Sequence, residues 1–80
     1  MIRIGVNRVE GVMKKDGPMV IVIDESIAIK VYPLEKEEPF THWIGGSVNL
    51  NYSENGMQVY KDGLLIDESS LALILAKLHW

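Results

Sequence analysis

The sequence of 80 residues contains no cysteine, only two histidines and only 8 % aromatic residues. The absence of cysteine excludes disulfide scaffolds, thiolate zinc sites and cysteine nucleophiles. No apolar run approaches the roughly 18 residues that a membrane-spanning helix needs, and no apolar stretch behind Arg3 and Arg8 makes a signal peptide. We therefore expect a soluble, cytoplasmic protein with a single domain over residues 1–80.

An excess of basic residues is also missing, because the formal net charge is −3. Residues 1–15 carry four basic side chains and one carboxylate, whereas residues 16–80 carry four basic side chains and ten carboxylates. Domains that bind nucleic acid usually present a dense basic face. A nucleic-acid partner is therefore not expected.

Motifs for catalysis and for metal binding are missing as well. The adjacent carboxylates at 24–25, 37–38 and 67–68 are interpreted as solvated turns and a helix cap, because neighbouring side chains usually diverge. His42 and His79 have no ligand-type spacing, and no serine lies in a nucleophile-elbow motif. We expect a non-enzymatic protein with no cofactor and no functional metal.

Alternating and β-branched apolar residues predict a β-rich fold. Residues 2–6 and 27–31 alternate, and the continuous apolar run 19–23 is typical of a central strand buried on both faces. Further strands are predicted at 48–52, 57–61 and 64–66, with turns at 14–18, 55–56 and 62–63. The predicted fold class is α+β: an antiparallel sheet or small open barrel of about five to six strands, with one C-terminal helix packed on it.

The C-terminal segment predicts a helix that begins near Asp67–Ser70, where oxygen-bearing side chains can cap free N–H groups. At 100° per residue, one stripe faces the sheet and consists of Leu71, Ile74, Leu75 and Leu78. The opposite side carries Leu73, Ala76 and Trp80, with Lys77 beside them. Because exposed apolar patches usually mark interfaces, we expect this side to form a homodimer.

Residues 41–47 are the candidate ligand-binding segment. Gly45 and Gly46 could offer backbone N–H groups to an anion, Trp43 could stack on a base, and His42 could donate to an anion; Ser47 is the last residue of this candidate site. No helix is predicted to follow, so the segment is neither a P-loop nor a dinucleotide fingerprint. The alternative interpretation is a bulged strand entry with Trp43 in the core.

Two function classes follow. The first is a protein-interaction module or inhibitor, which needs no motif and suits the apolar helix side. In size and style the chain resembles the compact proteins that phages encode to bind host machinery, and this resemblance of scale implies a protein-binding role. The second is a binder that sequesters a nucleotide or other small anion through residues 41–47, at a site that two subunits could share.

Overall fold

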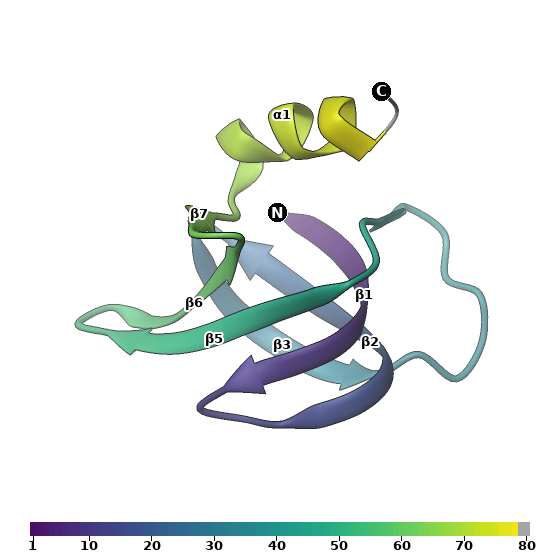
Figure 1. Cartoon of the computed structure of the whole chain (residues 1–80), viewed down its shortest axis with the longest axis horizontal. Helices are drawn as coiled ribbons and strands as arrows, with labels where there is room; N and C mark the ends of the chain where they lie inside the picture. Colours follow the sequence, from purple (N-terminus) through teal and green to yellow (C-terminus); the bar gives the residue numbers. More distant parts are fainter. Residues whose placement is uncertain (79–80) are drawn as a thin grey trace.

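The computed structural model describes residues 1–78, which form seven strands and one helix (Figure 1). The first three strands form an antiparallel meander: β1 (Ile2–Gly11), β2 (Lys15–Asp24) and β3 (Ile27–Pro33). The remaining elements are β4 (Thr41–Trp43), β5 (Ser47–Ser53), β6 (Gly56–Lys61), β7 (Leu64–Leu65) and α1 (Glu68–Leu78). The predicted α+β class, a sheet followed by one C-terminal helix, is confirmed.

The sheet is mixed, with the strand order β3-β2-β1-β5-β6-β7 and with β4 also beside β1. The parallel pairs are β1 with β4 and β1 with β5; the other neighbours are antiparallel. They arise because residues 34–40, which we name the crossover segment, carry the chain from the end of β3 to the start of β4. Within the described part of the chain the sheet curls without closing, and α1 lies across one end of it (Figure 1).

The turn predicted at residues 14–18 is wrong. The chain reverses at residues 12–14, and residues 15–18 belong to β2. There Gly17 and Pro18 lie opposite the single residue Asn7, which makes a β-bulge. Gly17 supplies a φ of 100°, and Pro18, which has no N–H to donate, is tolerated at the irregularity. The glycine therefore serves a bulge rather than the hairpin turn.

The main core fills the concave face of the sheet, under α1. It contains Ile4, Val6, Val9, Met19, Ile21, Ile23, Ala28, Ile44, Val48, Leu50, Val59, Ile66, Leu71 and Ile74. Leu71 and Ile74 are buried and Leu75 packs against them, which confirms the predicted stripe for these three residues; the Leu78 side chain lies outside the described part. Among residues 1–78, no helix is long and apolar enough to span a bilayer.

The start of α1 is fixed by a capping box. Asp67 Oδ1 accepts the backbone N–H of Ser70 at 2.8 Å, and Ser70 Oγ accepts the backbone N–H of Asp67 at 2.9 Å. The hydroxyl of Ser69 donates to the Asp67 carboxylate at 2.7 Å, and this bond, followed by the backbone N–H of Ser70, lowers the pKa of Asp67; the hydroxyl of Ser26 contributes a further bond at 3.2 Å. The helix start predicted from the sequence is therefore confirmed.

The meander also buries side chains on the face opposite the core, which we name the outer face. Val20 and Val22 are buried there, because successive side chains of β2 alternate between the two faces. The predicted burial of β2 on both sides is thus confirmed. The crossover segment covers part of the outer face: Tyr32 Oη donates to Glu38 Oε2 at 2.6 Å, and the Leu34 N–H donates to the Pro18 carbonyl at 3.0 Å.

Candidate binding surface on the outer face

Residues 41–47 form β4, a short break and the first residue of β5, rather than a loop. At the break Gly45 and Gly46 have φ values of 66° and 63°, in the left-handed region that glycine adopts readily. The carbonyl of Gly5 accepts the N–H groups of Ile44 and Gly45 at 2.9 and 3.1 Å. The glycines therefore let one segment of chain follow β1 in two successive parallel stretches.

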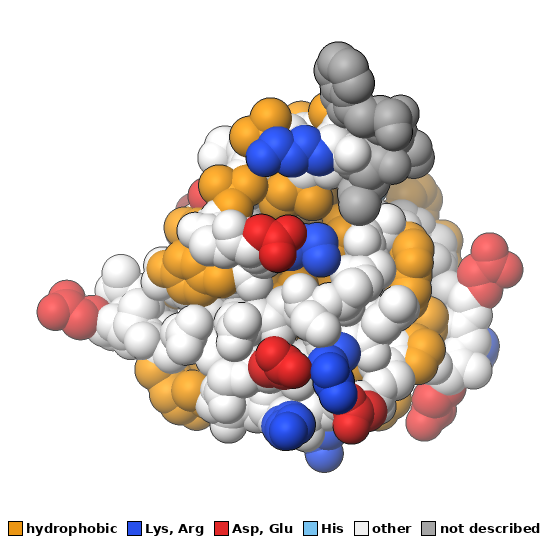
Figure 2. Space-filling model, viewed as in Figure 1, with side chains coloured by type: hydrophobic (Ala, Val, Ile, Leu, Met, Phe, Trp, Pro, Cys, Tyr) orange, Lys and Arg blue, Asp and Glu red, His pale blue; other side chains and the backbone are white. Residues whose placement is uncertain are grey.

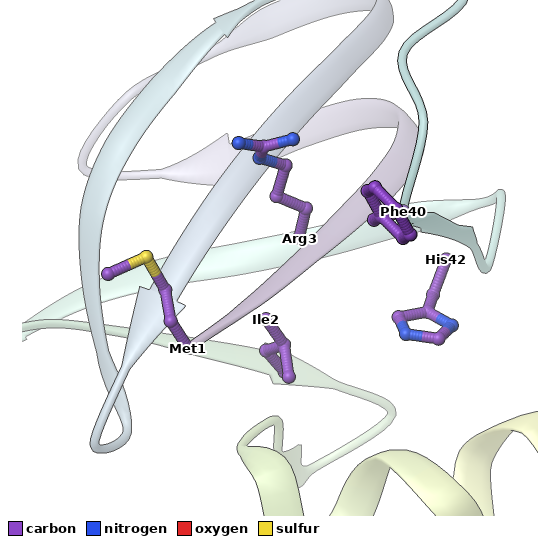
Figure 3. Close-up of a pocket in the computed structure, with 5 residues that line it drawn as sticks. All are labelled: Met1, Ile2, Arg3, Phe40 and His42. Atoms are coloured by element: carbon purple, nitrogen blue, oxygen red, sulfur yellow. The ribbon is translucent and has the colours of Figure 1, made fainter.

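The structure separates the predicted ligand-binding residues. His42 pairs with Ile4 and shares its face, whereas Trp43 pairs with Gly5 and lies on the outer face. His42 lines a cavity of about 290 Å³ near the N-terminus; Figure 3 shows His42 and Ile2 on the side of the helix and Arg3 directed to the other side. His42 and Trp43 therefore do not meet at one ligand.

Gly45 and Gly46 lie beside the side chain of Lys61, a contact that the sequence analysis did not predict. The ammonium of Lys61 donates to the Gly45 carbonyl at 3.4 Å, and a Cβ on Gly46 would lie 2.7 Å from Lys61 Nζ. The N–H of Gly45 is already bound to Gly5, and Ser47 is exposed at the start of β5. The indole nitrogen of Trp43 lies on the Gly45 side of the break, where a Cβ on Gly45 would be 3.4 Å from it, whereas Lys61 lies on the Gly46 side.

The Trp43 side chain is not part of the core, because 48 % of it is exposed. Its indole lies against the backbone of Gly5, where a Cβ would overlap ring atom Cε3. Gly5 is thus needed for close approach of the ring, and a glycine inside an alternating strand is the sequence signal for such contact. The pattern marked Gly5 as a strand residue but did not connect it with Trp43.

A cavity of about 190 Å³ adjoins Trp43 and is lined also by Leu34, Glu37, Glu38 and Thr41. The hydroxyl oxygen of Thr41 is buried and has no hydrogen-bond partner within residues 1–78. Glu38 accepts the hydroxyl of Tyr32, and this bond, with desolvation, raises the pKa of the tyrosine. The sequence had assigned Glu37 and Glu38 to a solvated loop, so their place beside Trp43 was missed.

Exposed apolar side chains surround this region. Phe40 is 89 % exposed and has a φ of 62°, which is strained for a bulky residue. Ile29 is also exposed, and it lines a cavity of about 310 Å³ together with Met1, Arg3, Val22, Lys30 and Tyr32. Phe40 lines the cavity near the N-terminus with Met1, Arg3 and His42, so it adjoins the outer face at its edge, through Met1 and Arg3. We name the outer-face patch by its six principal residues: Met1, Arg3, Ile29, Tyr32, Phe40 and Trp43.

Figure 2, in the same view as Figure 1, shows hydrophobic side chains beneath the helix and charged side chains gathered at the opposite end of the molecule. On the helix, Leu73 is 52 % exposed and Ala76 and Lys77 are exposed, while Trp80 lies outside the described residues. The predicted dimer side of the helix is therefore accessible at these three positions.

Comparisons with protein-family models, with curated proteins and with solved structures find no match for this chain. Its function has to be argued from its own surface. Within residues 1–78, no group of three or more His, Asp or Glu side chains is placed to hold a metal ion.

Proposed function

We propose that the protein is a non-enzymatic protein-binding module, or an inhibitor, that contacts its partner through the outer-face patch. The observation that carries this proposal is Phe40, an aromatic side chain held almost fully in solvent in a strained backbone conformation. Strain of about 1–3 kcal/mol persists only where the surrounding structure imposes it, and such positions cluster at binding sites.

The composition of the patch supports the same proposal. Its residues are aromatic side chains, Met, Ile and Arg, and aromatic residues, Met and Arg are enriched in the centres of protein interfaces. Arg3 is already oriented, since its Nη1 donates to the carbonyl of Pro39 at 3.4 Å. Such a surface is sufficient for an inhibitor, because a protein that blocks its partner's functional site by binding over it needs no catalytic residues of its own.

Photo-crosslinking at matched positions tests this proposal. A benzophenone amino acid replaces Phe40 in one variant and Tyr52 in another, since Tyr52 is an exposed aromatic residue of β5 outside the patch. In cells of the natural source, position 40 is expected to give a discrete adduct with one protein, and position 52 none. Adducts of equal yield at both positions, or none at position 40, would contradict the proposal.

A small anionic ligand is the second candidate, and Lys61 is the observation that favours it. A cavity of about 140 Å³ is lined by Lys61 and Lys77 with Asp62, Leu64 and Ile74, beside Gly46. A phosphate or another small anion bound there would raise the melting temperature by mass action. The rise should disappear in Lys61→Met, and a shift that persists would exclude this site.

A further inference from the structure

We propose that the cavity beside Trp43 receives an arginine side chain of the partner protein. This inference rests on the proposed function and names the chemistry that the outer-face patch recognises. The cavity combines an aromatic ring, two carboxylates, a buried hydroxyl oxygen and one leucine. Each of these groups has a counterpart in the arginine side chain.

The polar groups of the cavity favour a hydrogen-bond donor. Glu37 and Glu38 are carboxylates, and among residues 1–78 no basic side chain lines the cavity with them. Glu38 receives one donor, the Tyr32 hydroxyl, through Oε2, so its second oxygen can accept another. Thr41 Oγ1 is buried and has no partner among residues 1–78, so a donor in the cavity reaches it once the Thr41 side chain turns toward the cavity. A cation with several N–H groups satisfies all three.

The indole of Trp43, which lines one side of the cavity, favours a guanidinium over an ammonium group. The indole of Trp43 rests on Gly5 with one side and remains 48 % exposed, so it offers a fixed π surface. A guanidinium is planar, stacks on such rings and binds carboxylates through two parallel N–H groups, whereas an ammonium is a compact, strongly hydrated point charge. Leu34 can contact the methylene groups behind the guanidinium.

The size of the cavity fits one side chain. Sites for drug-sized ligands occupy roughly 300–1,000 Å³, whereas this cavity has a volume of about 190 Å³. The crossover segment has a net negative charge, because it carries Glu35, Glu37 and Glu38 against Lys36 alone, and this charge attracts a cationic side chain. An arginine that projects from a protein surface therefore fits better than a free nucleotide or cofactor.

An NMR titration with N-acetyl-L-arginine methylamide as the probe tests the inference. We expect shifts at the Trp43 indole N–H, assigned by its loss in Trp43→Leu, and at the amides of residues 34–43. The corresponding blocked lysine should bind at least about twofold more weakly, because it cannot stack as a plane. Equal affinity for the two probes, or no shifts at these amides, would overturn the inference.

Two charge-neutralising variants of the same loop provide the matched control. Glu37→Gln removes a carboxylate that lines the cavity, and Glu35→Gln removes an exposed carboxylate that does not. Glu37→Gln should weaken arginine binding about threefold, as expected for an exposed ion pair, while Glu35→Gln changes it by much less. Equal weakening by both would show general attraction to an acidic loop and would overturn the inference.

The crosslinking test of the protein interface and the titration test of the arginine cavity can fail independently of each other. Crosslinking at position 40 requires only that the outer-face patch meets a protein, whatever side chain that protein presents. If position 40 crosslinks and the arginine probe does not bind, the patch remains an interface and the arginine cavity is rejected. If the probe binds and position 40 gives no adduct, the cavity recognises arginine but the patch around Phe40 is not the interface.

Discussion

The two faces of the β1–β3 meander differ in how they are covered. On the inner face, the side chains of Ile4 and Ile21 are fully buried under residues from β5, β6 and α1. On the outer face, Val20 and Val22 are also buried, but their surroundings are more open. Val20 pairs with Gly5, which carries the half-exposed indole, and Val22 lines a cavity of about 310 Å³. A strand buried on both sides therefore need not serve stability on both sides; here the outer cover is also the binding surface that we propose.

Alanine substitutions on the two faces should give the largest contrast. Ile21→Ala is expected to lower the free energy of unfolding by about 3–4 kcal/mol, because it leaves a cavity in a filled core. Trp43→Ala should cost less than about 2 kcal/mol, since about half of the side chain is already in water. Urea denaturation of both variants measures this difference. A cost for Trp43→Ala equal to that for Ile21→Ala would make the outer face a second core.

The contact between Trp43 and Gly5 offers a sharper test. Gly5→Ala places a methyl group where the indole lies, and the displaced ring should cost about 1–3 kcal/mol. In a Trp43→Ala background the same change should be neutral or slightly stabilising, because alanine is normally preferred to glycine inside a strand. A double-mutant cycle by urea denaturation measures the coupling energy. Additive effects would mean that the indole does not need Gly5.

Thr41 should show that stability and binding oppose one another on the outer face. Thr41→Val removes the buried oxygen that has no partner within the described residues and keeps the shape of the side chain. We expect a gain of about 1 kcal/mol in the free energy of unfolding, since the cost of burying an unsatisfied hydroxyl disappears. The same variant should bind the arginine probe more weakly. A loss of stability would show that the hydroxyl does have a partner.

The sequence predicted those features that depend on local chemistry. Alternation located β1 and β3, a continuous apolar run located β2, and Asp67 with Ser70 marked the start of the helix. It missed β4, because three residues become a strand only through parallel pairing with β1, a partner far away in the chain. It also assigned a turn to Gly17, since a positive φ suits both a turn and a bulge.

The candidate site was predictable only in part. The sequence singled out Trp43, but it also placed His42 in the same pocket. Neighbouring residues of a strand point to opposite faces, so once residues 41–43 pair with β1 the two side chains must diverge. The approach of Glu37 and Glu38 to the indole depends on the path of the crossover segment. That path is fixed by Tyr32 near the end of β3 and by Arg3, which lies 36 residues before Pro39, and no alternation or turn pattern in the segment reveals either contact.

The helix presents a second exposed apolar surface, which is predicted to form a homodimer. Of the substitutions considered, one on this surface should change the stability of the monomer least. Leu73→Glu is expected to change the free energy of unfolding of the monomer by less than about 0.5 kcal/mol, because the side chain is 52 % exposed. Ile29→Glu is the matched control, since Ile29 is 49 % exposed and lies on the outer face.

Sedimentation equilibrium at tens of micromolar decides between the two surfaces. Burial of a few apolar side chains from each helix contributes about 10 kcal/mol at most, against an association cost of about 4–15 kcal/mol, so the expected dimer is marginal. One buried charge at Leu73 is then enough to dissociate it, whereas Ile29→Glu should leave it intact. If Ile29→Glu dissociates the dimer and Leu73→Glu does not, self-association uses the outer-face patch, and Phe40 would crosslink to a second copy of the chain. A wild-type monomer would remove the helix from consideration as an interface between copies.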